Sequence, residues 1–156
     1  MLTQDVEKSL FDHIESRSSF PPGAILWRPG EKFNERAEQW VQVRIVGIDR
    51  SNNDRYQQAF ELYDVEVTCY YKTDSKASVF GRLSRLVDSA RLLVDSSMRA
   101  PAAVIKSAST GEQLALMDFG AANESRQYNQ DVSIGGVGVP GVDLSILSTR
   151  CTVSSI

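Results

Sequence analysis

The sequence is poor in the residues from which metal sites and catalytic centres are built. It has one histidine, His13, and two cysteines, Cys69 and Cys151, in 156 residues. Each cysteine lies in an alternating, strand-like run, which favours reduced core thiols over a disulfide framework, a cysteine metal cluster or a functional pair. No nucleophile is near His13 in sequence, and its acidic neighbours favour a solvated or interfacial position over a general base. The motifs GxSxG, HExxH and CxxC are also missing, so we expect no catalytic residue, no metal and no enzyme.

Charge of one sign and long apolar runs are missing as well. The 17 basic and 20 acidic residues are mixed along the chain and give a net charge of −3, so no basic face is expected to hold a nucleic-acid backbone tightly. The N-terminus lacks the basic region and apolar run of a signal peptide, and no segment has the length and apolarity needed to span a bilayer. We therefore expect a soluble protein, made in the cytosol, with no membrane partner.

What the sequence does contain is a mixture of helical and strand-like patterns in a length that suits one domain. Helical spacing of apolar residues predicts helices over residues 3–17 and 78–97. Alternation or short apolar runs predict strands over residues 40–48, 60–72, 102–107, 113–119 and 142–155. Residues 49–58 are typical of a long hairpin loop, and the Pro-rich segment after the first helix is typical of an extended strap rather than a helix or a paired strand. The expected fold class is α+β, a mostly antiparallel sheet with two principal helices packed on it.

Two sets of charged side chains have both a functional and a structural interpretation. Asp64 and Glu66 lie two apart on the polar face of a predicted strand, as a metal or acid/base pair requires, or as part of a solvated sheet face. Three arginines recur at helical spacing in the second predicted helix: Arg82, Arg85 and Arg91. They either contact phosphate or form the charged outer face of the helix, where Asp95 can pair with Arg91. We favour the structural interpretation of both sets.

The stretch SIGGVGVPGVDLSI, residues 133–146, carries four of the ten glycines within seven positions. A phosphate-binding glycine loop leads into a helix N-terminus, whose free N–H groups face the anion. Here the glycines lead into a predicted strand, no lysine follows Gly141, and Pro140 has no amide to donate. We therefore expect no nucleotide and no other cofactor at this stretch.

Residues 123–143 are instead predicted to form a flexible arm or hairpin tip used in assembly. Glycines make this segment costly to order, and a neighbouring subunit can supply the missing contacts. The alternative is an ordinary hairpin within the protomer. Trp27, next to Arg28, is either an interface anchor or a plug that closes one end of the core. The candidate assembly interface consists of Trp27, Arg28, Val132, Ile134, Val137, Val139 and Val142.

The order of elements resembles that of the tail terminator proteins of tailed bacteriophages. The resemblance rests on the N-terminal amphipathic helix, the Pro-containing strap, the strands WVQVRIVGI and FELYDVEVTCYYK, the helix RLSRLVDSARLLV and the closing strand LSILSTRCTVSS. It spans nearly all of residues 1–156 and is one of pattern rather than of single identifying residues. Region 120–142 is longer than in the shorter members of the family.

The resemblance implies a structural virion protein of the tail or neck, made in the host cytoplasm, that assembles as a ring expected to be hexameric. Such a ring caps the tail tube, halts its polymerisation and presents a surface to the head connector. DNA passes through its centre without sequence-specific binding. The implied partners are further copies of the chain, the tail tube protein and the head–tail connector or adaptor protein. The alternatives are a head–tail joining protein of the neck, a small ligand-binding or enzymatic α+β domain, and a monomeric binding module.

Overall fold

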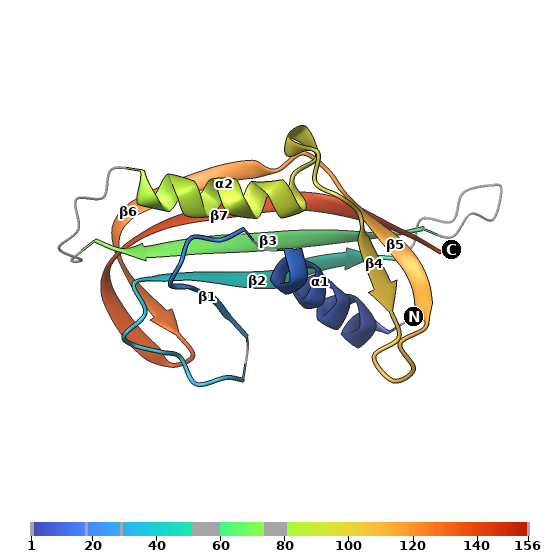
Figure 1. The fold of residues 1–156 in the computed structure, drawn as a ribbon, viewed down its shortest axis with the longest axis horizontal. Coiled ribbons are helices and arrows are strands. Elements are labelled where there is room, and N and C mark those ends of the chain that lie inside the picture. The colour runs from blue at the N-terminus through green and yellow to red at the C-terminus, as the bar shows by residue number, and fades with distance from the viewer. Residues whose placement is uncertain (1, 18, 29, 51–59, 74–80, 156) are drawn as a thin grey trace.

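The computed structural model describes residues 2–17, 19–28, 30–50, 60–73 and 81–155. These residues form helices and a seven-stranded sheet (Figure 1). The helices are α1 (Thr3–Arg17), α2 (Arg82–Val94) and the short 3-10 helix η1 (Ser96–Met98). The strands are β1 (Ala24–Trp27), β2 (Gln39–Asp49), β3 (Phe60–Lys72), β4 (Ala103–Lys106), β5 (Gln113–Phe119), β6 (Asn123–Ile134) and β7 (Val137–Ser155). The expected α+β class, a mostly antiparallel sheet with two helices in one domain, is confirmed.

Strand β7 is the centre of the sheet. Its 19 residues are long enough to hold two successive partners on one edge, β6 and then β5, while β3 pairs along the other edge. The sheet order is β1-β2-β3-β7-β5-β4, with β6 beside β7. The pairs of β7 with β3, β5 and β6 are all antiparallel. The central strand therefore connects the helix-covered core to the hairpin that carries the glycine cluster.

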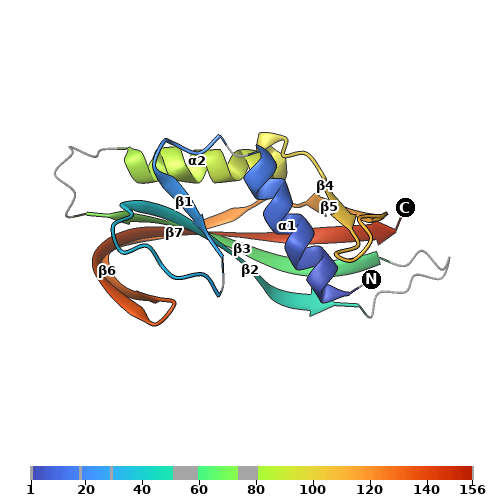
Figure 2. The ribbon, with the colours of Figure 1, turned by 60° about the horizontal axis from the view of Figure 1, so that its bottom comes forward.

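Both helices cover the same face of the sheet, and the ends of β6 and β7 curl away toward the opposite side (Figure 2). Helix α1 buries Val6, Leu10 and Ile14 at helical spacing. Helix α2 buries Leu86 and Leu93, which are 0% and 4% exposed. Burial of such a side chain contributes about 1.5–3 kcal/mol, so these stripes supply much of the stability. These side chains belong to the apolar stripes from which the two helices were predicted, whereas Leu2, at the start of the first stripe, is 67% exposed.

The boundaries of α2 differ from the sequence prediction. The helix begins after Gly81, whose φ of 92° is a left-handed backbone conformation that glycine adopts at little cost. Its last residue is Val94, and the backbone of the following residue, Asp95, is extended. The start of the predicted helix, residues 78–80, and most of the predicted loop over 49–58 lie outside the described residues.

Two segments pair where the sequence did not predict a strand. β1 lies within the predicted strap and pairs parallel with residues 39–42 of β2, so the expectation of an unpaired strap is wrong. Four residues are too few to show a period-2 pattern between prolines and glycines. β6 is a 12-residue strand within residues 121–134, a polar stretch whose sequence is only weakly strand-like. Most of its side chains are exposed, so its sequence lacks the apolar face that marks a half-buried strand.

Candidate assembly surface

The glycine cluster forms the turn of the β6–β7 hairpin. Gly135 and Gly136 lie between the paired residues Ile134 and Val137, with φ values of 57° and 81°. Positive φ at both central residues is what a two-residue hairpin of this twist requires. A Cβ on Gly135 would lie 3.2 Å from Cζ2 of Trp27, so the turn also packs closely against that ring. The glycines open a strand and not a helix, so they lack the helix N-terminus on which a phosphate cradle depends.

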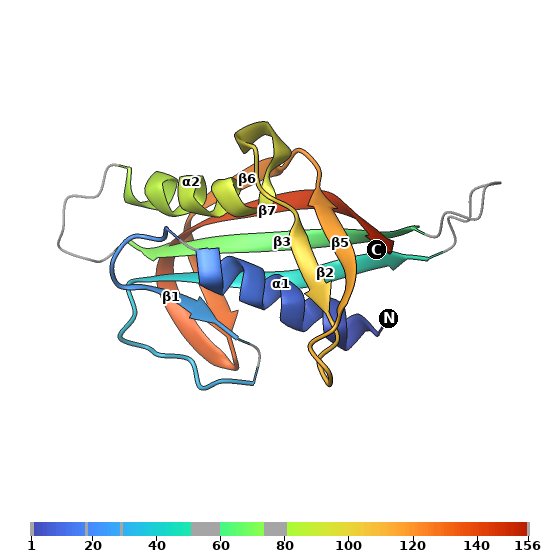
Figure 3. The ribbon, with the colours of Figure 1, turned by 45° about the vertical axis from the view of Figure 1, so that its right-hand side comes forward.

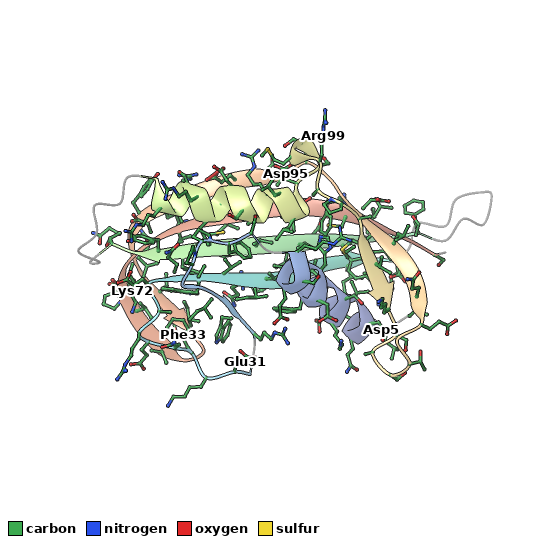
Figure 4. All side chains as sticks on the ribbon, viewed as in Figure 1. Asp5, Glu31, Phe33, Lys72, Asp95 and Arg99 are labelled. Atoms are coloured by element: carbon green, nitrogen blue, oxygen red, sulfur yellow. The ribbon has the colours of Figure 1, made fainter. Side chains whose placement is uncertain are left out.

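An aromatic cluster lies under this hairpin, on the sheet face opposite the helices. Trp40 is completely buried; its ring stacks on Tyr70 at 5.1 Å and meets the edge of Phe33 at 5.1 Å between ring centroids. Figure 4 labels Phe33 on the segment between β1 and β2, beside the curled hairpin. Large aromatic rings in such contacts are worth about 0.5–1.5 kcal/mol per pair beyond their burial. The aromatic cluster therefore fixes the hairpin to the protomer.

Trp27 belongs to the same cluster and Arg28 does not. Trp27 is 8% exposed, and its Nε1 donates a hydrogen bond to the backbone oxygen of Glu31 at 3.3 Å. Arg28 forms an ion pair with Glu15 of α1, and its guanidinium carbon lies 5.8 Å from the centroid of the Phe11 ring. Of the two interpretations of Trp27, the plug that closes one end of the core matches its position in the protomer.

The remaining candidate interface residues are divided by burial. Ile134, Val139 and Val142 are 2%, 6% and 0% exposed and pack in the aromatic cluster, whereas Val132 and Val137 are only partly buried. In the protomer the segment forms a hairpin that contacts the chain's own aromatic rings, which matches the alternative of an ordinary hairpin. Its use in assembly stays a prediction.

Asp64 and Glu66 lie on the uncovered face of the sheet, as the sequence predicts. Glu66 pairs with Arg44 of β2 at 3.0 Å, and Asp64 lies 3.6 Å from Arg150 of β7. In the part of the chain that the structure describes, no group of three His, Cys, Asp or Glu side chains is arranged to hold a metal ion. The interpretation as a solvated sheet face therefore fits the geometry, because Asp64 and Glu66 form cross-strand ion pairs with arginines.

His13 was predicted to be solvated or interfacial; it is buried, so the solvated position is wrong. It is 6% exposed, its Nε2 lies 3.0 Å from the backbone oxygen of Leu93, and its ring stacks on Phe119 at 5.4 Å. Burial lowers the pKa of this imidazole below its usual value, against the opposing effect of the Leu93 oxygen. With Nε2 engaged by a carbonyl, His13 acts as a core contact between the two helices and β5.

Both cysteines are free and completely buried, as the sequence predicts. Burial raises the pKa of each thiol, Cys69 and Cys151, to about 12. The thiolate is the reactive form of cysteine, so both side chains are held in their unreactive form at neutral pH.

Asp95 is a structural centre whose full role the sequence did not indicate. Its carboxylate is completely buried, and it pairs with Arg91 at 2.8 Å, as predicted. It also accepts hydrogen bonds from the backbone N–H of Ala122 at 3.0 Å and from the N–H and hydroxyl of Ser97 at 3.0 and 2.8 Å. Burial opposes the charged form, but these donors outweigh it and lower the pKa of Asp95 to about 2. The carboxylate thus joins the end of α2 to the segment that enters β6.

A groove of about 570 Å³ lies between α1 and β2. Figure 3 shows α1 crossing the sheet on this side. Phe11 of α1 and Val43 and Ile45 of β2 line it, with the charged side chains Lys8 and Arg44 among the rest of its lining. No pattern in the sequence indicates this groove, because it depends on how the helix crosses the sheet.

The comparisons with known proteins give no family. No model of a known protein family matches the chain, and no curated protein matches it.

None of the described helices is long and apolar enough to cross a membrane.

Proposed function

We propose that this chain is a tail terminator of a tailed bacteriophage. In this role it is a structural protein of the neck, and a ring of six copies caps the tail tube, ends its polymerisation and joins the tail to the head connector. The proposal starts from the order of elements on which the resemblance rests. The structural observation that supports it is that both helices pack on the same face of the sheet and leave the other face uncovered by helices.

The uncovered face supplies a reason why DNA would pass such a ring freely. Beyond the aromatic cluster this face carries the ion pairs of Arg44 with Glu66 and of Arg150 with Asp64. A surface binds DNA tightly when its Lys and Arg side chains neutralise phosphates and release counterions. Arginines whose charge is already balanced by a neighbouring carboxylate offer little of this attraction. A lumen lined by this face would therefore let DNA slide through it.

The test is an assembly assay with a tail tube protein, the partner that this proposal implies. Adding the purified chain to polymerising tube protein should stop tube growth, and electron microscopy should show a six-membered ring at the tube end. Tubes that keep growing with bare ends would refute the proposal. Binding to the head connector without binding to the tube end would favour the alternative of a head–tail adaptor protein.

One observation favours a second candidate, a small-ligand-binding domain. The groove beside α1 has a volume within the range of small-molecule sites, about 300–1,000 Å³. A ligand that binds only the folded chain raises its melting temperature. Thermal unfolding with nucleotides and divalent metals separates the two candidates, and we expect no shift for a tail terminator.

A further inference from the structure

Strand β2 has an open edge over most of its length. β1 pairs only with residues 39–42, so among the described residues no strand pairs the outer edge over residues 43–48. Val46 and Ile48, in this stretch, are 51% and 43% exposed. Proteins usually protect an open edge with charge, because its free N–H and C=O groups are a template for another strand. Apart from Arg44, this edge is apolar; it has a β-bulge between Ile45 and Gly47, and it lies beside the groove under α1.

A second open edge belongs to β6, at the other side of the sheet. β6 pairs with β7 on one side, and no described strand lies on its outer side. Between residue 123 and the irregularity after Gln127 the strand is regular, and Tyr128 directly beyond it is 59% exposed. Such a large exposed ring next to a free edge is suited to burial in a groove on a partner.

We propose that the open edge of β2 in one copy pairs with the open edge of β6 in the next copy, with Tyr128 seated in the groove between α1 and β2. The partner is thus a second copy of this chain, and the contact adds a strand to each sheet. The number of copies in the closed assembly rests on the proposed function, whereas the pairing itself does not.

Strand direction supports this pairing. β2 is antiparallel to β3, β3 to β7, and β7 to β6, so β2 and β6 run in opposite directions. Copies related by rotation about an axis along the strands then bring the two edges together antiparallel. When the register is followed across the sheet, the open stretches of β2 and β6 lie opposite neighbouring residues of β7. Adjacent copies therefore need to be shifted along the strand direction by only a few residues to align the two edges. A stagger of this kind is what closes a sheet into a barrel.

The two edges are also compatible in charge and in symmetry. Around the groove, Lys8 pairs with Asp12, Arg28 with Glu15 and Arg44 with Glu66. On β6, Glu124 pairs with Arg126. Apart from Glu7, which also lines the groove, the charged side chains named here are balanced by ion pairs, so strong repulsion between the edges is not expected. Because the two surfaces differ, the contact is head-to-tail, and such contacts generate closed rings when the rotation closes.

Disulfide cross-linking tests the pairing directly. Arg44 lies on the uncovered sheet face of β2, and Ser125 and Gln127 lie on the same face of β6 through their partners on β7. An equimolar mixture of Arg44→Cys with Ser125→Cys or with Gln127→Cys should give a covalent mixed dimer on oxidation. Arg44→Cys with Asp88→Cys, on the exposed side of α2, should not. The native thiols are buried and do not compete.

The outcomes separate this inference from the proposed function. A disulfide between two Arg44→Cys chains alone would replace it with pairing of two β2 edges, and the lack of any mixed dimer, in the free protein and on tail tubes, would overturn it. Cross-linking without six-membered rings on tube ends would leave the pairing standing and refute the tail terminator. Six-membered rings on tube ends without cross-linking would refute the pairing and leave the tail terminator standing.

A charge on the edge gives an independent measurement. Val46→Lys should weaken self-association about tenfold or more, measured by sedimentation, because it places an ammonium group at the centre of the proposed interface. Leu92→Lys is the matched control, since Leu92 is 45% exposed on α2 and should change association little. Equal association of both variants and the native chain would contradict the pairing. If Val46→Lys does not fold, the cross-linking result decides.

Discussion

Replacing Asp95 tests whether one buried carboxylate joins α2 to β6. In Asp95→Ala, the N–H groups of Ser97 and Ala122 lose a buried acceptor and Arg91 loses its partner. Each hydrogen bond to a charged group is worth about 1.5–3 kcal/mol and the losses overlap, so we expect a destabilisation of about 3–5 kcal/mol. Asp95→Asn keeps one oxygen acceptor but faces Arg91 with an amide, so we expect a smaller loss of about 1–2 kcal/mol.

The pH dependence of the same residue gives a second, sharper test. A carboxyl with a pKa of about 2 in the folded chain, against 3.8 as its ordinary value, contributes about 2 kcal/mol at neutral pH. Because the folded-state pKa of Asp95 is lowered, this stability is present above pH 3.8 and is lost as the pH falls toward 2.

The assay is urea unfolding of the native chain, Asp95→Asn and the exposed control Asp88→Asn from pH 7 to pH 2.5. The difference in unfolding free energy between the native chain and Asp95→Asn should shrink on acidification. Asp88→Asn should stay within about 0.5 kcal/mol of the native chain throughout. An equal, pH-independent effect of both substitutions would show that the Asp95 carboxylate does not hold this junction.

Three further predictions concern the core. Leu86→Ala and Leu93→Ala should each cost about 2–5 kcal/mol in chemical unfolding, because both side chains are buried under α2; losses below about 1 kcal/mol at both sites would mean that the packed face is wrong. Cys69 and Cys151 should react with a thiol reagent only as fast as the chain unfolds, since burial raises both pKa values to about 12; rapid labelling of the native chain would contradict this. Because burial lowers the pKa of His13, stability should fall as the pH drops from about 7 to 5, and His13→Asn, which removes the only histidine, should abolish that slope.

The elements with strong periodicity could be predicted from the sequence, and those defined by partners could not. The alternation in residues 60–72 placed Tyr63, Val65 and Cys69 on the buried face of β3, because one period-2 pattern admits only one inward face. The sequence indicates β6 only weakly, because the strand is exposed on both faces and pairs on one edge alone. The burial of His13 depends on its contacts with Leu93 of α2 and Phe119 of β5, which no local pattern encodes.

The candidate site shows the same division. The sequence indicated that Trp27 and the valines of the hairpin are apolar contacts, but not that Phe33 and Trp40 of the same chain would supply their partners. Asp95 was predicted to pair along its helix, since the spacing of residues 91 and 95 is local, whereas its bond to Ala122 joins positions far apart in sequence. The open edge of β2 depends on which strands pair with it, and the alternation of apolar and polar residues does not indicate which strands are its neighbours.

The hairpin tip offers a last test, in which two adjacent glycines serve as probe and control. Gly135→Ala and Gly136→Ala both place a side chain at positive φ, at a cost of about 1–2 kcal/mol each. A Cβ on Gly135 would also lie 3.2 Å from Trp27, while a Cβ on Gly136 would have nothing within 4 Å. The difference between the two variants therefore isolates the contact that fixes the tip to the aromatic cluster.

Hydrogen exchange measures that contact at the amides of the tip. In the native monomer we expect the amides of Ile134 and Val139 to exchange slowly, because both residues are paired in the β6–β7 ladder and packed against the aromatic cluster. Gly135→Ala should speed exchange at the tip more than Gly136→Ala does, while exchange in the β3–β7 pair stays unchanged. If both variants behave alike, the tip is fixed by its turn and not by Trp27. If the native amides exchange fast in the monomer and slowly only in an assembled ring, the hairpin is an assembly arm after all, because then a neighbouring subunit and not the chain's own rings orders it.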